Sequence, residues 1–248
     1  MHFVQYAVFQ SFPEIRAFTT TKKSFLQQKV RFTGDNEAIY LASRKELARL
    51  LGLKVRQLVF PRQTHSATVC AVDAVPDSEI TNTDALLTST PGICLCVQTA
   101  DCVPVLLFDS EKKVVAAVHA GWRGTVAGIV PHAVAEMTRI YACKPQHIWA
   151  AIGPSIGPLM YEVGNEVVDA VRAAVPHPEE ALQKYPGGKF HVDLWRANRN
   201  MLIDCGVREQ QIEVLAECSY VNAGKYYSAR RDGADTGRMV SGIILGCK

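Results

Sequence analysis

Short apolar and β-branched runs, each bounded by turn-forming residues, recur along the chain and predict a strand-rich protein. In the middle third we expect strands over residues 56–60, 67–72, 84–87, 93–98, 103–108 and 114–119. Outside it we expect strands over residues 2–9, 147–152, 212–215, 225–228 and 241–245. The polar and basic segment 11–34 shows no clear period, so we assign it no element.

Apolar residues at helical spacing predict four helices between or beside these strands. The helices are expected over residues 35–51, within 125–141, and over 164–175 and 193–205. Asp35 and Asp193 are candidate N-caps, and Gly52 and Gly206 follow the expected ends of their helices. Pro131 either kinks the second helix or marks its true start.

The order of these elements bears on the fold class. Strands come in runs, with helices between only some of them, which favours a mixed sheet over a doubly wound parallel one. The chain has 248 residues, of which 48% are apolar, so it is long enough to bury a sizeable core. We therefore expect a single α/β (α+β) domain spanning residues 1–248.

Charge and composition exclude some partners. The net charge is only +3 and the basic residues are scattered, so neither a nucleic acid nor a membrane surface is an expected partner. The N-terminus lacks the basic region and cleavage site of a signal peptide. The apolar run 93–108 contains Gln98, Asp101 and Pro104 and is too short to span a bilayer. We expect a cytoplasmic protein whose eight cysteines, none in a CxxC pair, are reduced.

Three segments place metal-ligating residues at the ends of expected strands. His65 stands in FPRQTHS, Cys102 in QTADCVPV, and His119 at the end of the strand in VVAAVHAGWRGT. Taken singly, each residue has an ordinary interpretation as a surface histidine, a core thiol or part of a tight turn. Taken together, two histidines and one cysteine suit a zinc ion with an open fourth position, which is typical of catalytic zinc.

Charged residues near these segments suggest further roles. Asp101 interrupts an apolar stretch, so its carboxylate must be paired or must reach a wet cavity. The glycine-rich turn after His119, with Arg123 nearby, suits either an anion such as phosphate or a tight strand-to-helix connection. The segment YSARRDGADTGRM near the C-terminus is either a substrate-binding loop or a solvated turn with local ion pairs.

Several motifs in order resemble the YfiH-type family, whose members are also called laccase-domain, polyphenol oxidase or purine nucleoside phosphorylase proteins. The motifs are QTHS at 63–66, TDALLT at 83–88, TADCVPVLLFD at 99–109, VHAGWRGTVAGI at 118–129, IGPSIGP followed by YEVG, DLWRAN, and RRDGADTGRM. One such motif would be weak evidence, but this many in order is strong. The resemblance covers most of the chain.

The resemblance implies a fold, a metal and an activity. The fold would be a YfiH-like mixed-sheet α/β/β/α sandwich. His65, Cys102 and His119 would be metal ligands and catalytic residues, for zinc usually and for copper as an alternative, and Arg44 would contact phosphate or substrate. The substrates would be adenosine, inosine, guanosine or methylthioadenosine with inorganic phosphate, and adenosine deamination would be a further activity. We expect the protein to act as a monomer or weak homodimer.

This chain departs from the family pattern in places that bear on specificity. Ser43 stands where the family usually has Asn before the helix arginine, and Ser155 stands where it often has Cys. Segment 19–34 lacks the glycine-rich loop that the family leads one to expect. The three metal ligands are retained, so we expect the chemistry to be retained and the substrate preference to be open.

Three other functions fit some of the same residues. In a cysteine hydrolase acting on a small molecule or cell-wall precursor, Cys102 would be the nucleophile and His119 or His65 its base. A copper-dependent polyphenol oxidase would need more histidines than the seven dispersed ones present here. A structural zinc module would need a fourth protein ligand.

Overall fold

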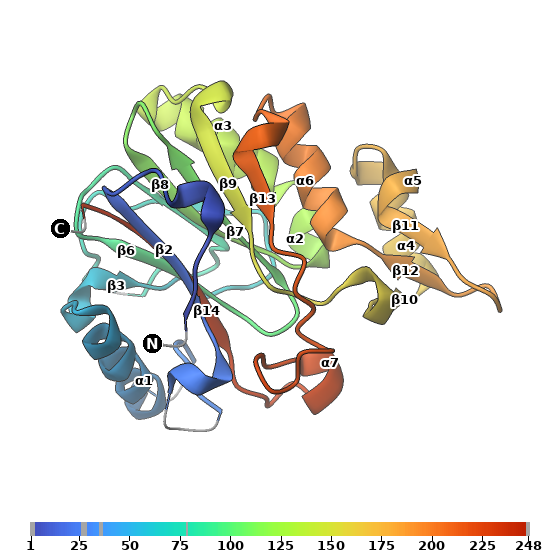
Figure 1. Cartoon of the computed structure of the whole chain (residues 1–248), viewed down its shortest axis with the longest axis horizontal. Coiled ribbons are helices and arrows are strands. Elements are labelled where there is room, and N and C mark those ends of the chain that lie inside the picture. The colour runs from blue at the N-terminus through green and yellow to red at the C-terminus, as the bar shows by residue number, and fades with distance from the viewer. Residues whose placement is uncertain (1–2, 26–28, 35–36, 78, 247–248) are drawn as a thin grey trace.

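Two large sheets pack face to face, with helices on their outer sides (Figure 1). This is a computed structural model, and it describes residues 3–25, 29–34, 37–77 and 79–246. The first sheet has the strand order β1 (Phe3–Val4), β2 (Ile15–Thr20), β14 (Met239–Leu245), β6 (Cys94–Thr99) and β3 (Leu58–Val59). Strand β14 runs antiparallel to both β2 and β6, so the two ends of the chain share one sheet.

The second sheet contains the strands expected in the middle of the chain. Its order is β13 (Ile212–Val214), β9 (Ile148–Ile152), β7 (Val103–Asp109), β8 (Val114–Ala120), β5 (Ala85–Thr88) and β4 (Val69–Ala71). Strands β7 and β8 are buried at every residue, because each is covered on both faces. The two outer pairs are parallel and the inner pairs antiparallel, so the expected mixed sheet is confirmed.

The remaining strands and the helices lie around these sheets. A small antiparallel sheet, which the sequence did not predict, has the order β10 (Glu162–Val163), β12 (Phe190–Val192) and β11 (Leu182–Lys184). The α-helices are α1 (Glu37–Leu51), α2 (Trp122–Val126), α3 (Ile129–Tyr141), α4 (Asn165–Ala174), α5 (Pro178–Ala181), α6 (Leu194–Asp204) and α7 (Ala229–Asp232). Six 3-10 turns span Ala7–Phe9, Lys22–Ser24, Val55–Gln57, Pro145–His147, Pro158–Met160 and Glu209–Gln211.

Three apolar layers hold the architecture together. Side chains such as Leu95 of β6 and Leu106 of β7 fill the layer between the two sheets. Helix α1 covers the outer face of the first sheet, and α3 and α6 cover the outer face of the second. This confirms the α/β/β/α sandwich. In the part of the chain described here, no helix is both long and apolar enough to cross a bilayer.

Two expected strands are wrong. Of residues 2–9, only Phe3–Val4 pair as a strand, because the chain then turns through a 3-10 helix that buries Tyr6 and Phe9 in the layer between the sheets. Residues 225–228 join no sheet. Their tyrosines are buried for another reason: the Tyr226 hydroxyl donates to Glu217 at 2.7 Å, and Arg231 donates to the Tyr226 carbonyl at 2.9 Å.

The helix boundaries follow local chemistry closely. The Asp193 carboxylate accepts the backbone N–H of Arg196 at 2.9 Å and so caps α6 as expected, whereas Asp35 lies outside the described residues. Gly128, with a φ of 77°, separates α2 from α3. Pro131 therefore lies in the first turn of α3 and marks a helix start rather than a kink.

Candidate metal centre

The three expected ligands come together where the chain passes from one sheet to the other. Cys102 lies in the turn between β6 of the first sheet and β7 of the second, and His119 is near the end of β8, which pairs with β7. His65 lies in the loop that follows β3. One possible ligand atom from each residue lies within 4.8 Å of the other two. The tertiary structure thus brings together residues that are 17 to 54 positions apart in the sequence.

Asp84, which the sequence analysis did not single out, holds two of the three candidate ligands in place. Its carboxylate is fully buried just before β5. One oxygen accepts from His119 Nδ1 at 2.8 Å and from the backbone N–H of His65 at 3.0 Å. The other oxygen accepts from the backbone N–H groups of Thr64 and Ser66, at 3.1 and 2.7 Å. Successive backbone N–H groups around a left-handed residue form an anion-binding nest, and the φ of 61° at His65 fits that geometry.

The contact with Asp84 decides which His119 nitrogen faces the centre. When Nδ1 donates to the carboxylate, Nε2 is left with a lone pair for a metal. Burial alone lowers the pKa of His119, but the Cys102 sulfur and Asp84 outweigh it and raise the pKa to about 9. Burial likewise raises the pKa of Asp84, but His119 and Ser66 outweigh it and hold that pKa far below its usual range.

Cys102 is the third candidate ligand, and its surroundings favour the thiolate. Burial alone raises its pKa, but His119 and then His65 outweigh burial and lower the pKa to about 6. The sulfur lies 3.8 Å from His65 Nε2. Two ligands of one tetrahedral zinc, at zinc–sulfur and zinc–nitrogen bonds of about 2.3 and 2.0 Å, lie roughly 3.5 Å apart. The donor set and its spacing therefore fit zinc, and the imidazole and thiolate donors also fit copper.

One side of the centre is open. His119 is buried, whereas Cys102 is half-buried and His65 is exposed. Within the described residues, the cluster of candidate ligands contains these three side chains and no fourth. Three protein ligands with one open position are typical of a catalytic rather than a structural zinc site. The arrangement can therefore present a metal to a substrate.

The glycine-rich turn after His119 serves close packing. A Cβ atom on Gly121 would lie 3.0 Å from both the Cys102 sulfur and the His65 ring. A Cβ atom on Gly124 would lie 3.1 Å from the Ser66 carbonyl. Arg123 is exposed and stacks on the Trp122 ring, with its guanidinium carbon 4.4 Å from the ring centroid. These contacts support the interpretation of the turn as a tight connection between strand and helix.

Asp101 is paired, as its buried position demands. Its carboxylate accepts the Ser219 hydroxyl at 2.6 Å and the backbone N–H of Arg230 at 2.7 Å. Its φ of 90° is outside the region that side-chain-bearing residues favour, so these contacts hold a strained backbone directly before Cys102. The Asp101 carboxylate thus stabilises the local backbone. Its position next to Cys102 in the sequence is not evidence that it acts as a general acid.

Arg44 lies on α1 and is half-buried between aromatic rings. Its Nε donates to the Phe32 carbonyl at 2.7 Å. Its guanidinium carbon lies 4.7 Å from the centroid of the Tyr40 ring and 4.8 Å from that of Phe60. Ser43 beside it is buried. The structure therefore fixes the orientation of Arg44, and its expected contact with phosphate or substrate stays a prediction.

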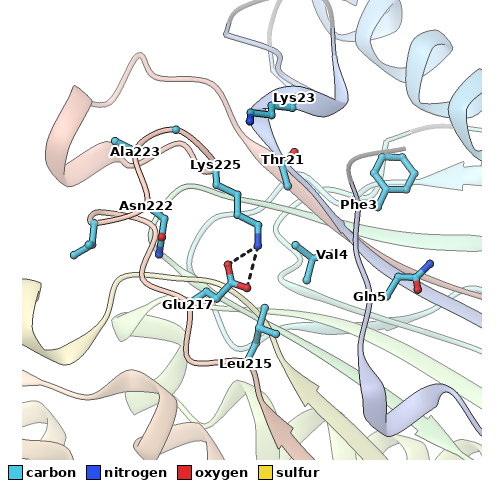
Figure 2. Close-up of a pocket in the computed structure, with 12 residues that line it drawn as sticks. Phe3, Val4, Gln5, Thr21, Lys23, Leu215, Glu217, Asn222, Ala223 and Lys225 are labelled. Atoms are coloured by element: carbon cyan, nitrogen blue, oxygen red, sulfur yellow. Dashed lines mark hydrogen bonds and ion pairs between the residues drawn. The ribbon is translucent and has the colours of Figure 1, made fainter.

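A sizeable cavity lies away from the candidate metal centre. It has a volume of about 850 Å³ and lies between the N-terminal strand and the segment 215–225. Figure 2 shows Lys225 reaching Glu217 across it, above the apolar side chains of Val4 and Leu215. None of the three candidate metal ligands lines it. This cavity and the candidate metal centre are therefore separate features of the molecule.

Comparison with known proteins agrees with the motifs. Residues 20–246 match the family described as multi-copper polyphenol oxidoreductase laccase. The chain is 34% identical to a purine nucleoside phosphorylase of Bacteroides thetaiotaomicron, over 97% of this chain and 95% of that protein. It is 40% identical to adenosine deaminase RL5 from an unknown prokaryotic organism, over 86% and 84% of the two chains.

A solved structure shares the same fold. The crystal structure of the hypothetical protein YfiH of Bacillus licheniformis superposes with a TM-score of 0.89 and is 30% identical, with 98% of this chain and 96% of that chain covered. The fold, the ordered motifs and the sequence relatives all agree. This chain belongs to the multi-copper polyphenol oxidoreductase laccase family, the YfiH-type family of enzymes.

Proposed function

We propose that this protein is a zinc-dependent purine nucleoside phosphorylase acting on adenosine, inosine, guanosine or methylthioadenosine. The observation that carries the proposal is the open-sided set of His65, Cys102 and His119. The relatives named purine nucleoside phosphorylase, which match nearly the whole chain, supply the reaction. We also propose that residues 1–248 act as one catalytic domain, since β2 and β14 from the two ends of the chain are paired.

In phosphorolysis, an oxygen of inorganic phosphate forms a bond to C1′ of the ribose while the bond from C1′ to the purine nitrogen breaks. The purine leaves with the bonding electron pair and takes up a proton. Zinc bound by the three ligands would supply Lewis-acid stabilisation of negative charge. Asp84 keeps the Nε2 of His119 available, and exposed His65 leaves a path for substrate. Arg44 is proposed to contact phosphate or substrate through the guanidinium edge that its aromatic neighbours orient.

Adenosine deamination is a second candidate activity. The relative named adenosine deaminase RL5 is 40% identical, which favours this reaction specifically. The same open metal centre would serve both reactions, because each acts on a purine nucleoside. The two are separable by product: phosphorolysis of adenosine yields adenine, whereas deamination yields inosine.

The test is to purify the protein without added metal, determine bound metals by mass spectrometry, and incubate it with adenosine with and without phosphate. The proposal predicts near-stoichiometric zinc and adenine that forms only when phosphate is present. Inosine formed without phosphate would identify deamination as the main reaction. Absence of both metal and nucleoside turnover would refute the proposal and favour a cysteine hydrolase with Cys102 as nucleophile.

Two controls sharpen this test. The Cys102→Ala variant is expected to lose zinc and phosphorolysis together, and retention of both would contradict the assigned ligand set. Copper is expected to displace zinc when added in excess, because divalent copper generally binds such donors more tightly. Copper found at this site after such treatment would therefore be no evidence for a polyphenol oxidase.

A further inference from the structure

Two arginines near the metal centre differ from several other arginines of this protein in lacking an acidic partner. Arg139, Arg172 and Arg199, for example, each pair with an Asp or Glu side chain. Among the residues that the structure describes, Arg230 and Arg238 form no such pair. Both belong to the segment YSARRDGADTGRM, which the sequence left undecided between a substrate-binding loop and a solvated turn.

Arg230 is tied to the residue that precedes the Cys102 ligand. Its backbone N–H donates to the Asp101 carboxylate at 2.7 Å. The main chain of Arg230 therefore contacts the turn that contains Cys102. Among the described residues, the Asp101 carboxylate accepts from this N–H and from the Ser219 hydroxyl, and it forms no ion pair with the Arg230 guanidinium. That guanidinium lies over the Tyr161 ring, 5.2 Å from its centroid, and donates to the Glu162 carbonyl at 2.9 Å.

Arg238 reaches the same edge of the sandwich from another strand. It directly precedes β14, whose first residue, Met239, pairs with Thr99 at the end of β6. The chain before Met239 and the chain after Thr99, which continues to Cys102, therefore leave the sheet together. Burial and then Arg31 lower the pKa of Arg238, whereas the negative charges of Cys102 and Asp101 act in the opposite direction.

Arg31 brings a second positive charge beside Arg238. Arg238 and Arg31 both donate to the Ala234 carbonyl, at 2.9 and 3.1 Å. The nearby acid, Asp235, is fully exposed and lies 3.6 Å from Arg31. Arg238 also donates to the Thr236 carbonyl at 2.6 Å. The guanidinium groups of Arg31 and Arg238 are thus held close together with one solvent-exposed carboxylate, that of Asp235, and the excess of positive charge around Arg238 attracts an anion.

Arg231, which lies between these two arginines in the sequence, stabilises the loop that carries them. Arg231 donates to the carbonyls of Ser219, Tyr220 and Tyr226, at 2.8, 2.6 and 2.9 Å. It also pairs with Asp232 at 2.8 Å. Arg231 therefore holds the loop while Arg230 and Arg238 keep donors for a ligand. A site ordered in advance loses less entropy when it binds.

We propose that Arg230 and Arg238 form an anion subsite beside the metal centre and that its ligand is a phosphate group. Guanidinium groups match phosphate oxygens with paired hydrogen bonds, and two of them suit a dianion. Inorganic phosphate and a phosphate ester share this chemistry. The identification of the ligand as inorganic phosphate rests on the proposed function, whereas the existence of the subsite is independent of it. This location differs from Arg44, whose guanidinium is packed between Tyr40 and Phe60.

The test measures binding of inorganic phosphate and of adenosine 5′-monophosphate to the zinc-loaded protein by calorimetry. Arg230→Gln and Arg238→Gln are each expected to weaken phosphate binding about tenfold or more while zinc content stays unchanged. Arg→Lys at the same positions is expected to restore part of the affinity, because the charge returns without the paired geometry. Arg172→Gln, which breaks an ion pair on α4, is the matched surface control and is expected to change nothing.

The outcomes separate the subsite from the proposed function. Unchanged phosphate binding in both Gln variants would overturn the subsite. If Arg238→Gln fails to fold, Arg230→Gln and Arg238→Lys carry the test. Arginine-dependent phosphate binding without nucleoside phosphorolysis would support the subsite and refute the proposed function. Arginine-dependent binding of the nucleotide but not of inorganic phosphate would support the subsite and overturn inorganic phosphate as its ligand.

Discussion

Replacing Asp84 by asparagine tests the central claim about the metal centre, that one buried carboxylate positions two ligands. The change keeps the shape of the side chain but turns one acceptor oxygen into a donor. If the amide nitrogen replaces the oxygen near His119, the donors of His119 and His65 both lose their acceptor. If it replaces the other oxygen, the backbone N–H groups of Thr64 and Ser66 lose theirs. Either orientation leaves two buried donors unsatisfied.

The size of the effect follows from this count. Each unsatisfied buried donor costs about 1–3 kcal/mol, so we expect Asp84→Asn to lower the free energy of unfolding by about 2–6 kcal/mol. In the first orientation, His119 can recover a hydrogen bond only by moving its proton from Nδ1 to Nε2, which blocks the nitrogen that would bind the metal. Loss of such a supporting carboxylate typically weakens metal binding by about 10- to 100-fold.

The assay combines zinc titration against a chromophoric chelator with urea unfolding of the metal-free protein. Asp109→Asn is the matched control, because Asp109 is also fully buried but lies at the far end of β7. It accepts the backbone N–H groups of Glu111 and Lys112 at one oxygen and that of Lys144 at the other. We expect this control to lose about 1–3 kcal/mol of stability and to bind zinc normally. Wild-type zinc affinity in Asp84→Asn would refute the reasoning.

Three further predictions test the centre and the core around it. Gly121→Ala is expected to lower zinc content, because its Cβ would lie 3.0 Å from both the Cys102 sulfur and the His65 ring. The control Gly224→Ala, whose Cβ would meet nothing within 4 Å, should retain zinc. Equal zinc content in the two variants would contradict the prediction. Removal of the metal with a chelator is expected to expose the Cys102 thiolate to iodoacetamide, as mapped by peptide mass spectrometry. The fully buried Cys94 and Cys96 are expected to stay unmodified. Alkylation of Cys102 that zinc does not slow would argue against its role as a ligand. Leu106→Ala, in the layer between the sheets, is expected to lower the free energy of unfolding in urea by about 2–5 kcal/mol without changing zinc stoichiometry. A decrease below about 1 kcal/mol would mean that this layer is less well packed than the structure shows.

Much of the architecture is readable from the sequence because its strands are long and continuously apolar. Residues 103–108 and 114–119 predict β7 and β8 almost to the residue, since strands covered on both faces exclude polar side chains. The small sheet β10–β12–β11 was missed because its strands have only two or three residues and are partly exposed. Strand β2 lay hidden in a segment whose charged neighbours obscure its pattern.

The candidate ligands were readable for a different reason. His65, Cys102 and His119 are the residue types that bind zinc, and the ordered motifs of the family include all three. Asp84 was overlooked although TDALLT places a carboxylate directly before a fully buried strand, the same signal that drew attention to Asp101. That signal says that a buried carboxylate needs partners, and it does not say which partners it has.

The sequence by itself thus determined the long buried strands and the longer helices, which residue types could bind a metal, and which family the chain resembles, because each of these depends on local pattern and chemistry. Only the tertiary structure decided that β14 lies between β2 and β6, that Asp84 joins His65 to His119, and that Arg230 lies beside the Cys102 turn. These contacts join segments up to 230 residues apart. They arise from packing of the two sheets as a whole, which no local pattern encodes.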